Sequence, residues 1–275
     1  MIRQLLRNLS DSPLGTRVRA WSGIRAPQTV RPWRAGDTVS DLFMWRCDKE
    51  WQTVFLLSNI PTLIDPASKI ADRVSLEVYN AAGHRIGKQD SVLAPGETKQ
   101  IEISSLIADR MEDGCGTFCA FHHPERPPRL LEEKSMNISE RGYVGYRRSG
   151  DEIWAIVHGN ANAFAMGAAQ PYSISVVTSA TQIYRLQVRL DDCIKFQLAC
   201  SNPSQKPQTL TAQYHDDEGA LVGTCDAVVP ARGVHLFDSS AISKRACLVE
   251  LFSNVMVWRP LVFKFYSGHF DVFHG

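Results

Sequence analysis

The stretch RCDKEWQTVFLLSN, residues 46–59, has a counterpart in RLDDCIKFQLACSN, residues 189–202. At a constant offset of 143, an arginine and an aspartate precede each apolar run, and a Ser-Asn pair ends it. Side chains at every second position of a strand share a face, which places Thr53, Phe55 and Leu57 together. The two stretches therefore predict one buried strand that occurs twice.

Further matches follow in the same order along the chain, and they indicate an internal duplication. They are Tyr79 with Tyr214, Ile86-Gly87 with Val222-Gly223, Asp90 with Asp226, Ile101-Glu102 with Phe237-Asp238, Ser149-Gly150 with Ser267-Gly268, and His158-Gly159 with His274-Gly275. No single match is strong, and the collinear order carries the inference. The alternative is a coincidence between two β-rich stretches that share turn residues.

Each copy contains about seven short apolar runs separated by turn signals, a pattern typical of β-sandwiches and jelly rolls. We therefore expect an all-β fold of two tandem β-sandwich units, Ig-like or jelly-roll-like. The expected strands are 51–57, 74–79, 86–93, 98–103, 115–121, 143–147 and 153–157 in the first unit, and 194–200, 209–214, 221–229, 234–237, 247–252, 261–266 and 270–273 in the second. NAAG, HDDEG, APGE and PARG are expected hairpin turns in which glycine supplies a positive φ.

The expected division of the chain is an arginine-rich arm over 1–37, a first unit over 38–160, a linker over 161–180 and a second unit over 181–275. The arm contains seven arginines and two acidic residues. It has few aromatic residues for contacts to bases, so packing across the units or contact with a second subunit is favoured over nucleic-acid binding. A homo-oligomer built through the arm is one hypothesis.

Composition describes an ordinary globular protein. The 275 residues are 44% apolar and 21% charged, with a formal net charge of +1, which recommends neither nucleic acid nor an anionic membrane as partner. We find no apolar run of about 18 residues for a membrane-spanning helix. The N-terminus lacks the apolar core of an export signal. Seven cysteines, an odd number, favour reduced thiols and a cytoplasmic location.

The offset between matched positions of the two units decreases along the chain. The first unit therefore carries about eight extra residues within 60–73 and thirteen within 122–140. If strand direction alternates, both insertions emerge at one end of the sandwich, where binding surfaces are commonly built. The alternative is that long loops merely tolerate drift. The predicted ligand-binding residues are Asp65, Lys69, Arg73, His122, His123, Glu125, Arg126 and Arg129.

Other chemically active patterns have structural interpretations that we prefer. Cys115, Cys119 and the following His122-His123 lack a zinc-type spacing, so we expect structural thiols and no metal or other cofactor. The repeated His158 and His274 are expected to be structural caps. The repeated Asp90 and Asp226 are expected to make hydrogen bonds within or across strands.

The chain carries no G-x-S-x-G, H-E-x-x-H, Walker or dinucleotide-binding motif. We therefore expect a non-enzymatic binding or assembly protein that holds a carbohydrate or a partner protein at the long loops of the first unit. The alternative is an enzyme, metal-dependent or not, that acts on a polysaccharide or related glycan.

Overall fold

The structure is a computed structural model that describes residue 18 and residues 38–107, 114–125, 142–166, 170–175, 177–188, 193–238, 246–255 and 259–274. The expected N-terminal arm lies outside the described residues except for Val18. The chain is all-β, as predicted, and it forms four small antiparallel sheets. No helix among the described residues has the length and apolar character needed to cross a membrane.

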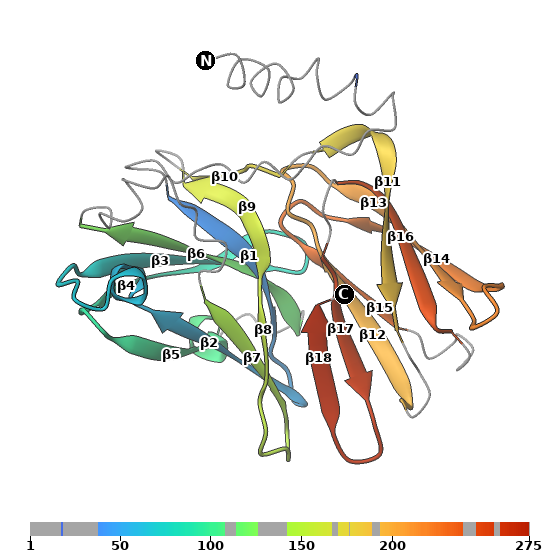
Figure 1. Cartoon of the computed structure of the whole chain (residues 1–275), viewed down its shortest axis with the longest axis horizontal. Helices are drawn as coiled ribbons and strands as arrows, with labels where there is room; N and C mark the ends of the chain where they lie inside the picture. Colours follow the sequence, from blue (N-terminus) through green and yellow to red (C-terminus); the bar gives the residue numbers. More distant parts are fainter. Residues whose placement is uncertain are drawn as a thin grey trace.

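Ten strands and two short helices make up the first half of the chain (Figure 1). They are β1 (Val39–Arg46), β2 (Trp51–Ser58), α3 (Ile60–Ile64), β3 (Asp72–Asn80), β4 (Arg85–Leu93), β5 (Thr98–Glu102), η1 (Ile103–Leu106), β6 (Cys115–Pro124), β7 (Tyr143–Arg148), β8 (Ala155–His158), β9 (Asn160–Met166) and β10 (Pro171–Ser173).

Eight strands make up the second half. They are β11 (Val177–Gln187), β12 (Lys195–Ser201), β13 (Gln208–His215), β14 (Leu221–Val229), β15 (Val234–Asp238), β16 (Leu248–Val255), β17 (Leu261–Phe265) and β18 (Phe270–His274). The expected linker, 161–180, carries β10, most of β9 and the start of β11.

The strand order of the first half recurs in the second. Sheet A contains β1-β6-β3-β4, extended at its β1 edge by β9 and β10, and sheet B is β5-β2-β7-β8. Sheet C is β11-β16-β13-β14, and sheet D is β15-β12-β17-β18. Each strand of the second half thus takes the position of the strand ten numbers before it, which is the repeat that the sequence matches predict.

The four sheets are arranged as a propeller-like ring, and the expected two separate sandwiches are not what the structure shows (Figure 1). The physical reason lies in sheet D, which packs on both faces. Leu198 and Val262 join a core with sheet C, while Phe263 and Val272 join the core of sheets A and B. Alternating side chains of sheet D therefore point into two different cores. One of these cores contains residues of both halves of the chain.

Buried polar contacts recur at matched positions. The Asn59 side chain donates to the carbonyls of Ile70 and Leu93 at 3.0 and 3.2 Å, and the Asn202 side chain donates to those of Lys206 and Val229, both at 2.9 Å. Each asparagine thereby ties the end of one strand to the end of a neighbouring hairpin, which explains why the Ser-Asn pair occurs in both copies.

Asp90 and Asp226 make the expected cross-strand hydrogen bonds. Each accepts from a hydroxyl on the adjacent strand at 2.5 Å, Ser75 in the first half and Thr211 in the second. A carboxylate bound in this way stabilises the pairing of β3 with β4 and of β13 with β14. The repetition of these residues is therefore structural.

The hairpin turns contain one departure from expectation. Gly83, Gly96 and Gly219 have positive φ as predicted, but in PARG the positive φ of 60° belongs to Arg232. A Cβ on the neighbouring Gly233 would lie 2.3 Å from the Ala81 carbonyl oxygen, so this glycine is needed for close approach between the halves. The Arg232 side chain donates to the Pro171 carbonyl at 2.8 Å.

Candidate functional site

The two insertions of the first half meet at one end of sheet A. The backbone N–H of Glu125, at the start of the second insertion, donates to the carbonyl of Ala71, at the end of the first, at 3.3 Å. Arg73 on β3 lies opposite His123 on β6. The remainder of the second insertion, with the predicted Arg126 and Arg129, lies outside the described residues.

His122 does not face solvent in this cluster. Its Nδ1 lies 2.8 Å from Oδ2 of Asp72, and both side chains are buried. The same carboxylate oxygen accepts from the backbone N–H of Ile60, which begins α3. Asp72 and His122 thus fix the first insertion to the end of the sheet, and this pair has a structural explanation.

The other predicted residues have varied surroundings. His123 is half-buried, its Nδ1 lies 3.2 Å from Thr38 Oγ1, and burial lowers its pKa. Asp65 is exposed and accepts from the backbone N–H of Ala67. Lys69, Arg73 and Glu125 are exposed. The described part of this cluster therefore offers an exposed surface of mixed charge, and its role in ligand binding stays a prediction.

The cysteines are all free, and five of the seven are buried. Burial raises the pKa of the Cys47 thiol to about 11 and raises the pKa values of Cys119 and Cys200 further. Such thiols are protonated and unreactive at neutral pH. Within the described residues, no cluster of three or more histidine, cysteine, aspartate or glutamate side chains could hold a metal ion.

A second candidate site lies where the halves meet. The edge strands β8 and β18 lie against each other, although no backbone pairing joins these two described strands. At their C-terminal ends the rings of His158 and His274 are 4.2 Å apart, and His274 Nε2–H donates to the His158 carbonyl. The repeated histidines contact each other, and each makes a hydrogen bond to a backbone carbonyl.

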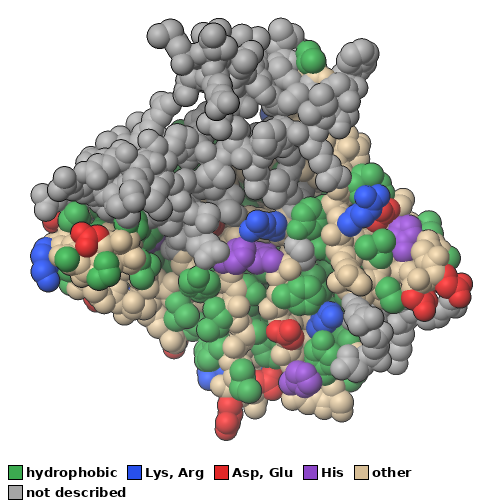
Figure 2. Space-filling model, in the orientation of Figure 1, with side chains coloured by type: hydrophobic (Ala, Val, Ile, Leu, Met, Phe, Trp, Pro, Cys, Tyr) green, Lys and Arg blue, Asp and Glu red, His purple; other side chains and the backbone are tan. Residues whose placement is uncertain are grey.

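The opposite ends of β8 and β18 form an open pocket of about 740 Å³. Its walls are the β7–β8 hairpin and the β17–β18 hairpin, whose Ser-Gly tips are matched positions of the repeat. The lining residues are Gly150, Asp151, Glu152, Ile153, Trp154, Ala155, Tyr266, Gly268, His269, Phe270 and Asp271. Figure 2 shows hydrophobic side chains, with acidic, basic and histidine side chains among them, on this face of the molecule.

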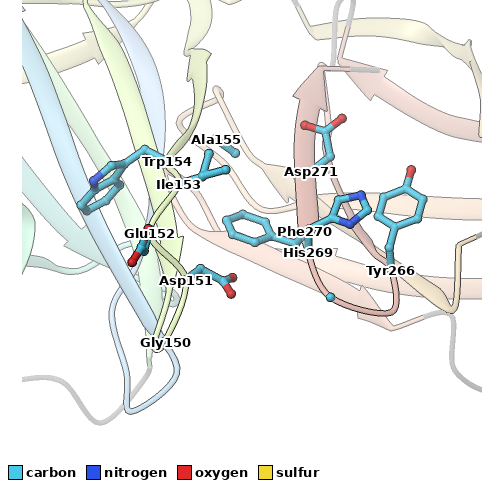
Figure 3. A pocket seen from close by; sticks show the side chains of 11 residues that line it. Gly150, Asp151, Glu152, Ile153, Trp154, Ala155, Tyr266, His269, Phe270 and Asp271 are labelled. Atoms are coloured by element: carbon cyan, nitrogen blue, oxygen red, sulfur yellow. The ribbon is translucent and has the colours of Figure 1, made fainter.

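Ile153 and Phe270 extend toward one another across the pocket (Figure 3). Ile153 is 79% exposed, an unusual position for a large aliphatic side chain. Phe270 is held from behind by Trp51, with ring centroids 5.0 Å apart. Tyr266 and His269 stack at 4.5 Å on the wall of the second half. The pocket therefore has an apolar centre on a rigid aromatic support.

Three carboxylates surround this apolar centre: Asp151, Glu152 and Asp271. In the described part of the chain none of them forms an ion pair. Asp271 accepts from the backbone N–H of Val272 at 2.8 Å, and Oδ2 of Asp151 is a buried atom without a hydrogen-bond partner. The pocket is therefore negatively charged and able to accept hydrogen bonds.

Sequence reasoning placed both hairpins correctly but gave them no function. The signal was the match of Ser149-Gly150 with Ser267-Gly268, together with the apolar Ile153 directly after the acidic Asp151 and Glu152.

No family model and no curated protein matches the sequence. Among solved structures, the chain is similar to a β-glucuronidase from glycoside hydrolase family 2, with 11% sequence identity over 90% of this chain and 26% of that chain. The TM-score is 0.18, and a likeness at this level carries no argument about function. The chain spans about a quarter of the length of that protein.

Proposed function

We propose that this protein is a non-enzymatic binding or assembly protein that holds a basic segment of a partner protein in the pocket between the β7–β8 and β17–β18 hairpins. The observation that carries the proposal is the combination of Ile153 and Phe270 with three carboxylates that form no ion pair with any residue that the structure describes. We also infer that the two halves arose by duplication of one eight-stranded, sandwich-like unit, because their strand orders agree.

A protein ligand is favoured over a carbohydrate by the kinds of side chain that are exposed. Sugar rings stack most often on tryptophan faces, but Trp45 and Trp51 are buried, and Trp154 points away from the pocket and stacks on Arg147. The aromatic rings at the pocket are Phe270 and the pair of Tyr266 and His269, which already stack on each other. Aliphatic Ile153 and Ile156 are exposed instead. Lysine and arginine combine an apolar stem with a cationic group, which suits an apolar centre ringed by carboxylates.

The experiment is a titration at 150 mM salt with fluorescent hexa-arginine, with hexaglutamate and a set of neutral hexasaccharides in parallel. We expect hexa-arginine to bind, and the double variant Asp151→Asn/Asp271→Asn to bind it about tenfold more weakly, because two charge-assisted contacts are lost. The matched control is Asp217→Asn, which removes an exposed carboxylate from a turn outside the pocket. If the control loses as much affinity for hexa-arginine as the double variant, the binding is general electrostatic attraction and not recognition by the pocket. Selective binding of a saccharide would overturn the proposal.

The insertion loops of the first half are the second candidate surface, since the structure places the start of one beside the end of the other. Lys69→Ala and Arg73→Ala test them in the same titration, because both side chains are exposed and their removal does not disturb a core. An effect in these variants, without one in Asp151→Asn/Asp271→Asn, would move the ligand site to the loops.

A further inference from the structure

The contact between β8 and β18 joins the ligand pocket to the histidine pair. Both strands begin at residues that line the pocket, Ala155 and Phe270, and both end at histidines. Because no backbone ladder connects these strands, their separation depends on side-chain packing and on the bond from His274 to the His158 carbonyl. Any force that separates the histidines is applied to the two strands that carry the pocket walls.

We propose that the His158–His274 contact is an acid-sensitive latch that holds β8 against β18, and that its opening on acidification moves the two pocket hairpins apart. The proposal concerns regulation of the pocket and rests on the proposed function only in its effect on ligand binding. The movement of the hairpins is a property of the fold and can be measured without a ligand.

The surroundings of His274 disfavour a second proton. With Nε2–H bound to the His158 carbonyl, a proton would be added at Nδ1, which is buried. Among the described residues, the charged or titratable groups facing the ring are His158 from β8 and Arg259 from the segment before β17, which oppose a positive charge, whereas the His158 and Pro260 backbone carbonyls favour it. Burial is the largest cause, and together these surroundings lower the pKa of His274 to about 4.

His158 is fixed in the complementary role. Its Nδ1–H donates to the Gly159 carbonyl at 2.9 Å, and its own carbonyl receives the bond from His274. If opening returns His274 to its ordinary pKa of 6.5, protonation favours the open form about 25-fold more at pH 5 than at pH 7.5. The shift acts on a junction that has no ladder hydrogen bonds.

The experiment measures the distance between the hairpins by double electron–electron resonance. Spin labels are placed at Ser149→Cys and Ser267→Cys, two exposed and matched positions, in a background of Cys225→Ser and Cys247→Ser. We expect a longer and broader distance distribution at pH 5 than at pH 7.5. His274→Gln, which retains a neutral donor that does not titrate, is expected to abolish this difference.

The matched control is His235→Gln, because burial also lowers the pKa of His235 but this residue lies on β15, away from β8. The control variant is expected to retain the full acid response. An unchanged distance at pH 5, or a response that persists in His274→Gln, overturns the latch. A normal acid response in a protein that binds no hexa-arginine at either pH leaves the latch standing and overturns the proposed function instead.

Discussion

Replacing Asn202 by alanine tests whether the two halves are equivalent in energy as well as in strand order. The change removes a hydrogen bond to the buried Val229 carbonyl, one to the Lys206 carbonyl, and the acceptor of the Ser204 backbone N–H, all at 2.9 Å. Leaving such groups unpaired costs about 1–3 kcal/mol each. Because water enters partly at the strand ends, we expect a total loss of about 3 kcal/mol.

Asn59→Ala should cause the same loss, since Asn59 donates twice and also accepts from Thr62. The assay is urea unfolding followed by tryptophan fluorescence and far-ultraviolet circular dichroism, with midpoints compared at constant slope. Asn80→Ala is the control: its side chain accepts one exposed hydrogen bond, from the His84 backbone, and the expected loss is below about 1 kcal/mol. The reasoning would be refuted if Asn202→Ala lowered the free energy of unfolding by less than about 1 kcal/mol while Asn59→Ala lowered it by about 3 kcal/mol.

Four further outcomes follow from the structure. Because the pKa of His274 is lowered to about 4 in the folded state, the unfolded state takes up a proton at higher pH than the folded state does. The free energy of unfolding is therefore highest above about pH 6.5 and falls toward pH 4 by up to about 3 kcal/mol. Urea unfolding midpoints measured at stepped pH values check this, and His274→Gln should show a smaller fall. Gly116→Ala should lose more than about 2 kcal/mol, because its Cβ would lie 2.2 Å from the Tyr79 carbonyl oxygen, whereas Gly268→Ala, with open space around it, should change the unfolding free energy by less than about 0.5 kcal/mol. Dialysis against a chelator should leave the melting temperature unchanged, and stoichiometric zinc or calcium in the purified protein would favour the enzymatic alternative. Deleting residues 1–34 should lower the mass measured by sedimentation if the arm joins subunits, and an unchanged mass would remove that hypothesis.

Much of the fold could be predicted because most strands are short apolar runs bounded by turn residues, a pattern visible within the strand's own sequence. The predicted strand 221–229 coincides with β14, in which exposed and half-buried residues largely alternate. By contrast, β1 was missed because Leu42–Trp45 is buried without interruption, and periodicity alone does not distinguish such a run from a buried helix segment. β11 was missed because its first residues, in VTSATQ, are mostly polar.

The pocket could not be predicted, because it depends on how the halves are placed relative to each other. Matched positions in the sequence identified His158 with His274 and one hairpin tip with the other, but equivalence in a repeat does not imply contact. The expected separate sandwiches would have kept these residues apart. Their meeting follows from the second apolar face of sheet D, and the Phe263 and Phe265 side chains that form it look like ordinary core residues in the sequence.

The double burial of sheet D also determines what each half can do when separated from the other. A fragment ending before β11 would leave Trp51 without its aromatic neighbours on β17 and β18, and a fragment beginning there would present Phe263, Phe265 and Val272 to water. Each fragment would therefore tend to aggregate or to associate with the other fragment. The two halves repeat one strand order, yet the core that sheet D completes makes each half dependent on the other for its folding.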